Sequence, residues 1–146
     1  MEKTWIIVAN GSKARIFALD NVRKMHEIDG LVHVESRFLD RDMKSDRPGR
    51  SYDSFGGARH AIEREFDPHE QTMLVFAQQI TRYLQSAQQD RKFDRLFLAA
   101  SPHFLGLLRP LLNEQIKKAI VAEFDKDWTS LTPNQIMEHL PFAMLS

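Results

Sequence analysis

Continuous apolar runs predict the central strands of this chain. Residues 5–9 and 95–100 are such runs, which are typical of strands covered on both faces of a sheet. Turn-forming residues follow the first run and residues 14–19 return as a second strand, so the pattern predicts a β-hairpin. We expect a weaker third strand between residues 25 and 34, and a last strand over residues 119–124.

Capping patterns predict three helices, and apolar residues at helical spacing support the first two. The first begins with the capping-box pattern of Asp67, Pro68 and Glu70 and ends near Gln89. Its apolar stripe has spacings of three and four residues and consists of Met73, Ala77, Ile80, Leu84 and Ala87.

The second helix begins at Ser101 and Pro102, in the same manner of N-cap followed by proline, and bends near Pro110. Its expected apolar face consists of Phe104, Leu107, Leu108, Leu111 and Leu112. The third helix is capped by Thr132 and ends near Leu140.

This order of elements predicts an α/β fold. Because a long helix precedes residues 95–100, that strand is expected to run parallel to residues 5–9 and to neighbour them in the core. The result is a ribonuclease-H-like mixed sheet of about five strands with helices on its faces. A length of 146 residues fits one domain, residues 1–146, with a long loop at about residues 37–66.

Composition narrows the function classes. With no cysteine, the chain has no disulfide, thiolate zinc site or cysteine nucleophile. The first apolar run is too short for a signal peptide or a membrane span, so we expect a cytoplasmic protein without membrane contact. Twenty basic and twenty acidic side chains cancel, so any contact with nucleic acid must come from local clustering.

The loop at residues 37–66 is the best candidate for function, because a structureless loop longer than about 15 residues is uncommon without a task. Its arginines alternate with glycines and aromatic residues, a mixture that can grip phosphates and stack on unpaired bases. The candidate RNA- or phosphate-binding residues are Arg47, Gly49, Arg50, Tyr52, Gly56, Gly57, Arg59 and His60. Two other interpretations stay open: a solvated loop whose charges pair internally, and histidines, His60 and His69, that ligate a metal.

A second candidate site follows from topology, because ligands of open α/β sheets bind beyond the carboxyl ends of the parallel strands. The residues expected there are Asn10, Ser101, His103, Asp125, Lys126 and Asp127. Helix capping, turn formation and a solvated strand exit would explain the same residues without a ligand.

A two-metal nuclease would need carboxylates on adjacent strands that bridge ions about 4 Å apart. Neither residues 5–9 nor residues 95–100 carry an acid. We therefore assign no catalytic residue, metal or cofactor, and leave a hydrolase or nuclease open only through Asp125, Asp127 or His60.

The chain resembles the bacterial family described as host attachment protein, or protein required for attachment to host cells, over nearly its whole length. The segments that carry the resemblance are residues 14–17, 31–33, 35–37, 40–42, 45–54, 56–57, 59–60, 67–68, 93–96, 104–106 and 125–127, with Glu70. Val34 stands where we expect proline in the family.

This family is similar in turn to the middle domain of archaeal and eukaryotic peptide-chain release factors, whose Gly-Gly-Gln loop enters the peptidyl transferase centre. Gly56 and Gly57 stand at a similar place, but Ala58 occupies the glutamine position, so the resemblance does not imply release activity. It implies a loop that contacts ribosomal RNA or a tRNA end, in ribosome rescue or translation quality control. We expect a non-catalytic, RNA- or ribosome-associated accessory protein; the alternative is an interaction protein in host attachment.

Overall fold

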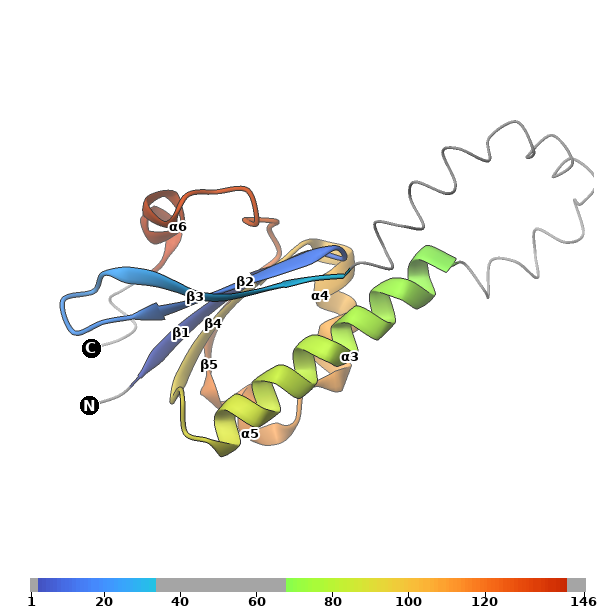
Figure 1. The fold of residues 1–146 in the computed structure, drawn as a ribbon, viewed down its shortest axis with the longest axis horizontal. Helices are drawn as coiled ribbons and strands as arrows, with labels where there is room; N and C mark the ends of the chain where they lie inside the picture. The colour runs from blue at the N-terminus through green and yellow to red at the C-terminus, as the bar shows by residue number, and fades with distance from the viewer. Residues whose placement is uncertain (1–2, 34–67, 142–146) are drawn as a thin grey trace, which may run out of the picture.

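The computed structural model describes residues 3–33 and 68–141, which build one five-stranded sheet in the order β3-β2-β1-β4-β5 (Figure 1). The strands are β1 (Thr4–Ala9), β2 (Lys13–Leu19), β3 (Met25–Val32), β4 (Arg95–Ala100) and β5 (Ile120–Phe124).

The expected pairing of the two apolar runs is confirmed. β1 pairs in parallel with β4 and antiparallel with β2, and Ile7 lies opposite Leu98 on one side and Ile16 on the other. All six residues of β1 are buried, as a central strand covered on both faces requires. The α/β class and the mixed five-stranded sheet are therefore as predicted, and the arrangement is consistent with a ribonuclease-H-like fold.

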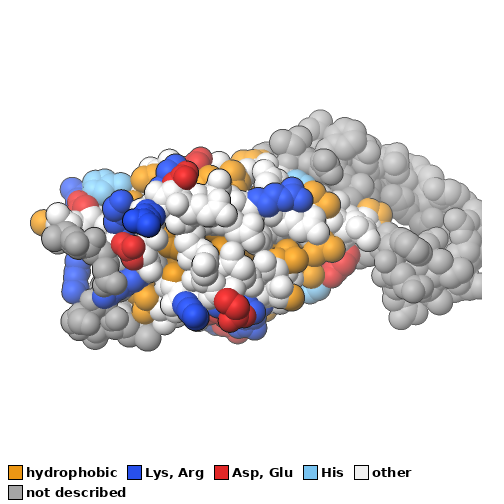
Figure 2. All heavy atoms as spheres, turned by 90° about the horizontal axis from the view of Figure 1, so that it is seen from below, with side chains coloured by type: hydrophobic (Ala, Val, Ile, Leu, Met, Phe, Trp, Pro, Cys, Tyr) orange, Lys and Arg blue, Asp and Glu red, His pale blue; other side chains and the backbone are white. Residues whose placement is uncertain are grey.

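Helices cover both faces of the sheet. On one face lie α3 (Pro68–Gln89), α4 (Pro102–Leu108), the 3-10 helix η3 (Arg109–Leu111) and α5 (Glu114–Ala119), while α6 (Pro133–His139) lies on the other (Figure 1). The outer surface of the first layer carries both basic and acidic side chains (Figure 2). None of the helices within residues 3–33 and 68–141 has both the length and the apolar character that a bilayer span requires.

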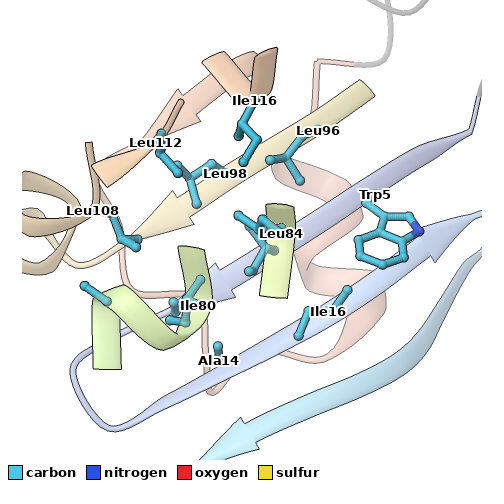
Figure 3. Packing of buried hydrophobic residues seen from close by; sticks show 14 of the residues in the cluster. Trp5, Ala14, Ile16, Ile80, Leu84, Leu96, Leu98, Leu108, Leu112 and Ile116 are labelled. Carbon is cyan, nitrogen blue, oxygen red and sulfur yellow. The ribbon is translucent and has the colours of Figure 1, made fainter. Parts of the chain in front are cut away.

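The larger core lies between the sheet and α3. Ile80 and Leu84 of α3 point onto the strands, where Ile16 and Leu98 meet them (Figure 3). Alternate β1 residues such as Ile6 point the other way, into the core under α6. This alternation follows from the period of two along a strand and fixes which face each helix covers.

The predicted stripe of α3 is confirmed, with Met73 only partly buried and Phe76 buried beside it. Ser101 occupies the N-cap position of α4, but its hydroxyl makes no capping hydrogen bond. Asp67, the expected cap of α3, lies outside the described residues. Thr132 caps α6 by the full reciprocal pattern with Gln135.

The sequence pattern missed one element, α5. Its N-cap is Asn113, whose side chain accepts a hydrogen bond from the backbone N–H of Ile116. Ile116 is the one buried residue of this short helix, so the sequence has no apolar stripe that would predict it. The last strand consequently begins at Ile120 and not at Ala119, which closes α5.

Candidate functional site

The carboxyl ends of four strands meet at one edge of the sheet. β4 runs parallel to β1, and β5 runs parallel to β4. Because β2 is antiparallel to both β1 and β3, β3 points in the same direction as β1, β4 and β5. The residues that follow these strands therefore lie along this edge, which we call the strand-end edge. They are Asn10, His33, Ser101 and Asp125.

Asn10 organises the turn after β1 and also reaches across the edge. Its side-chain oxygen accepts hydrogen bonds from the backbone N–H groups of Ser12 (2.8 Å) and Lys13 (2.9 Å), which closes the turn. Its side-chain amide donates to Asp127 Oδ2 (3.0 Å) and to Thr129 Oγ1 (3.1 Å). Two members of the predicted strand-end set, Asn10 and Asp127, are thus brought together.

The Asp127 carboxylate is held ionised by its neighbours. Its Oδ1 accepts hydrogen bonds from the backbone N–H (3.0 Å) and the hydroxyl (2.6 Å) of Thr129. Burial by itself would raise the pKa of Asp127, but the bonds from Thr129 and Asn10 and the charge of Lys13 outweigh it, so the pKa lies below its usual value.

Arg15 ties the segment after β5 to the sheet. Its guanidinium donates to the carbonyl oxygens of Thr129 (3.0 Å) and Leu131 (2.7 Å) and forms a two-pronged pair with Glu27, at 3.0 and 2.9 Å. The bond to Glu27 raises the pKa of Arg15 and lowers the pKa of Glu27. The guanidinium also lies 5.0 Å from the centre of the Phe17 ring. All of these contacts are internal, so Arg15 here stabilises the fold.

The side chains of the other members of the predicted strand-end set do not join the hydrogen bonds between Asn10, Asp127 and Thr129. Ser101 meets the end of β1 through its backbone N–H, which donates to the Ala9 carbonyl at 3.3 Å. The His103 ring contacts the Glu70 carboxylate of α3, with Nε2 at 2.8 Å from Oε2. Asp125 and Lys126 are exposed to solvent.

The last described residue before the long loop is anchored at the same edge. His33 donates its backbone N–H to the Ser12 carbonyl at 2.8 Å, and its buried ring stacks on Phe76 of α3 with centroids 4.9 Å apart. Gly11 completes the contact, because a Cβ there would lie 2.7 Å from side-chain atoms of Met73 and would force that side chain to move. The turn after β1, the end of β3 and the first turns of α3 therefore pack as one unit.

The candidate phosphate-binding residues of the loop, from Arg47 to His60, lie outside the described residues. Within residues 3–33 and 68–141, no group of three or more His, Asp or Glu side chains could hold a metal ion. The sequence reading missed Thr129 and Glu27 as partners at this edge. One signal was available for Arg15, which is a charged residue among the apolar residues Ala14 and Ile16 to Leu19 of β2.

Comparison with known proteins places the chain in a family. Among curated proteins, no sequence match is found. A family model described as "protein required for attachment to host cells" matches residues 5–140, which include every strand except the first residue of β1. The chain therefore belongs to the family of proteins required for attachment to host cells.

Proposed function

We propose that this protein binds RNA as a non-catalytic accessory of the ribosome, through the arginines and glycines of the loop at residues 37–66. One observation supports this proposal most. The described residues on either side of the loop, His33 and Pro68, both lie at the strand-end edge, where the sheet and α3 hold them. A rigid scaffold that presents a long loop is a common way to carry a binding function.

The chemistry of the loop supports a phosphate-rich partner. Arg47, Arg50 and Arg59 can each grip a phosphate with two parallel N–H donors, while Tyr52 offers a face for an unpaired base. The resemblance to the release-factor middle domain supports the ribosome as the place where such a loop would act. Ala58 at the glutamine position argues for contact without peptidyl-tRNA hydrolysis.

The test replaces Arg47, Arg50 and Arg59 together by glutamine. If they grip phosphates, affinity for ribosomes or structured RNA should fall, and the log–log salt slope should flatten by roughly one unit per lost contact. The melting temperature should stay nearly unchanged. Co-sedimentation with ribosomes from the protein's own cell lysate, at low and high salt, measures the first effect.

A matched control replaces Lys24, Arg82 and Lys92 by glutamine, which removes the same charge from exposed positions outside the loop. This control should bind like the wild type. A wild-type protein with no affinity for ribosomes or structured RNA near physiological salt would end the proposal. The proposal would also end if the triple glutamine variant changed the protease sensitivity of the loop but not the affinity for RNA. That result would mean that the arginines pair with Asp42, Asp46 and Asp53.

The family description favours a second candidate, an interaction protein that acts directly in attachment to host cells. If the role is direct, purified protein added to host cells should bind saturably and should compete with bacterial attachment. If it is indirect, loss of the gene should reduce attachment, while added protein should not compete.

A further inference from the structure

A pocket lies at the opposite edge of the sheet from the strand-end edge, where α3 ends, β4 begins and α5 packs beside them. Its volume is about 480 Å³, within the usual range for small-molecule sites. Its lining includes Gln88, Arg91, Phe93, Asp94, Gln115 and Lys118. Buried Phe93 forms part of its wall, while the charged residues are exposed.

The basic groups at this pocket are free to meet a ligand. Neither Arg91 nor Lys118 forms an ion pair with another residue in the part of the chain that the structure describes. Asp94 is the one acidic side chain of the lining, and its Oδ2 already accepts a hydrogen bond from the backbone N–H of Lys3 at 2.8 Å. The ammonium of Lys3 is close as well, since it donates to the Arg91 carbonyl at 3.1 Å. The surroundings therefore favour a negative ligand.

The backbone of Arg91 is unusual and holds this residue at the pocket. Its φ of 57° lies in the left-handed region. It occupies the position after the C-cap of α3 in a Schellman motif, where Arg91 N–H donates to Gln88 O and Lys92 N–H donates to Ala87 O, both at 2.9 Å. Glycine is the usual residue there, because it has no Cβ to strain. An arginine at this position places a guanidinium at the pocket, but it carries the backbone strain of a left-handed conformation, which glycine would avoid.

We propose that this pocket binds a small phosphate-bearing molecule. The Arg91 guanidinium can grip a phosphate with two donors and Lys118 can add a point charge, while the amides of Gln88 and Gln115 can hydrogen-bond the remaining atoms. The cations converge on one pocket and are not spread along a groove, which favours a small molecule over a polynucleotide. Acidic side chains lie among the basic ones on this side of the molecule (Figure 2), which also argues against a polynucleotide track.

The test titrates the full chain with adenosine monophosphate, inorganic phosphate and adenosine, followed by calorimetry and NMR. The two phosphates should bind saturably and adenosine should not. Arg91→Gln and Lys118→Gln should each weaken binding about tenfold, as loss of one charge-assisted hydrogen bond does. Arg91→Gly should weaken binding to the same degree while leaving the melting temperature unchanged or raised, because glycine suits the left-handed backbone.

Arg82→Gln is the matched control, because it removes an exposed arginine of α3 that does not line the pocket. Four results would overturn the proposal: no saturable binding of either phosphate up to about 10 mM, adenosine binding as tightly as its monophosphate, equal weakening by Arg82→Gln, or binding of an RNA without terminal phosphates that the pocket variants abolish. The pocket variants leave the sequence of the loop at residues 37–66 unchanged, so failure of phosphate binding here and failure of the RNA-binding proposal can be told apart.

Discussion

Asp127 joins two distant segments through one side chain. It is 117 residues from Asn10 in the sequence, yet the two side chains are 3.0 Å apart, and the same carboxylate closes the turn at Thr129. Because three donors converge on it, the ionised form is stabilised relative to an unfolded chain in water. The carboxylate is thus a structural anion at the strand-end edge.

Asp127→Asn should destabilise the protein at pH 7 by about 0.5–1.5 kcal/mol, because an asparagine amide would meet the amide of Asn10 as a second donor. The folded-state pKa of Asp127 is lowered, so its stabilisation is present above the unfolded value of about 3.9 and is lost as the pH falls through the folded value. Urea unfolding at pH 7 and at about pH 3 should show a difference from wild type that shrinks in acid.

Asp125→Asn is the control at this edge, because the Asp125 side chain forms no hydrogen bond or ion pair with another described residue, whereas Asp127 accepts three hydrogen bonds. It should change the unfolding free energy by no more than about 0.5 kcal/mol. A loss equal to that of Asp127→Asn would mean that charge at the edge matters and the hydrogen-bond network does not.

At the scale of elements, a hydrogen bond between side chains links α3 to the exposed edge strand β3. The Tyr83 hydroxyl donates to Asp29 Oδ2 at 2.7 Å, while Tyr83 also packs near Trp5, with ring centroids 6.2 Å apart. β3 has β2 as its one strand neighbour in the described sheet, and most of its residues are exposed. The bond from α3 therefore supplements the ladder that holds this edge strand.

Burial and the bond to Asp29 raise the pKa of Tyr83 to about 12, which allows a direct test of this link. The other tyrosine, Tyr52, lies outside the described residues, so a Tyr52→Phe variant leaves Tyr83 as the one phenol to titrate. Its phenolate absorbance should appear with a midpoint near pH 12. Adding Asp29→Asn should lower the midpoint, because the bond and the repulsion between two anions are both removed.

The raised pKa of Tyr83 also determines how the stability of the protein changes with pH. The contribution of Tyr83 to folding should be complete below its unfolded value of about 10 and should be lost as the pH rises through the folded value. A midpoint near 10 in protein that circular dichroism shows to be folded would contradict the link.

At the scale of the whole molecule, one apolar layer between the sheet and α3, α4 and α5 holds most of the chain together. Leu98 lies in this layer on the central strand β4 and is fully buried (Figure 3). Leu98→Ala should lower the free energy of unfolding by about 2–5 kcal/mol, through lost transfer energy and the cavity left behind. Thermal and urea unfolding measure this loss.

Val75→Ala on the outer side of α3 is the comparison, because Val75 is 45% exposed. Its effect should stay within about 0.5 kcal/mol. An unchanged melt for Leu98→Ala would contradict the burial of β4 on both faces.

The helix α3 separates Pro68, which follows the loop in the sequence, from the pocket beside Arg91. The 22 residues of α3, at about 1.5 Å of rise each, put roughly 33 Å between its two ends. Pro68, the first described residue after the loop, begins α3 at the strand-end edge, and the pocket beside Arg91 lies at the other end of this helix.

The sequence alone determined the elements wherever the signal is local. A strand buried on both faces needs an uninterrupted apolar run, so residues 5–9 and 95–100 could be recognised without any partner. The stripe of α3 and the capping box at Thr132 are equally local, because residues three and four apart share a helix face. From these followed the α/β class and the parallel pairing of β1 with β4.

Only the tertiary structure decided which polar groups meet. The bond between Asn10 and Asp127, the grip of Arg15 on the carbonyls of Thr129 and Leu131, and the pocket shared by Arg91 and Lys118 all join positions far apart in the sequence. Such contacts depend on the strand order and on how each helix packs. Neither of these produces a periodic pattern of residues in the sequence. The short helix α5 escaped prediction for a related reason, since one buried isoleucine makes no stripe and only packing shows that a helix is there.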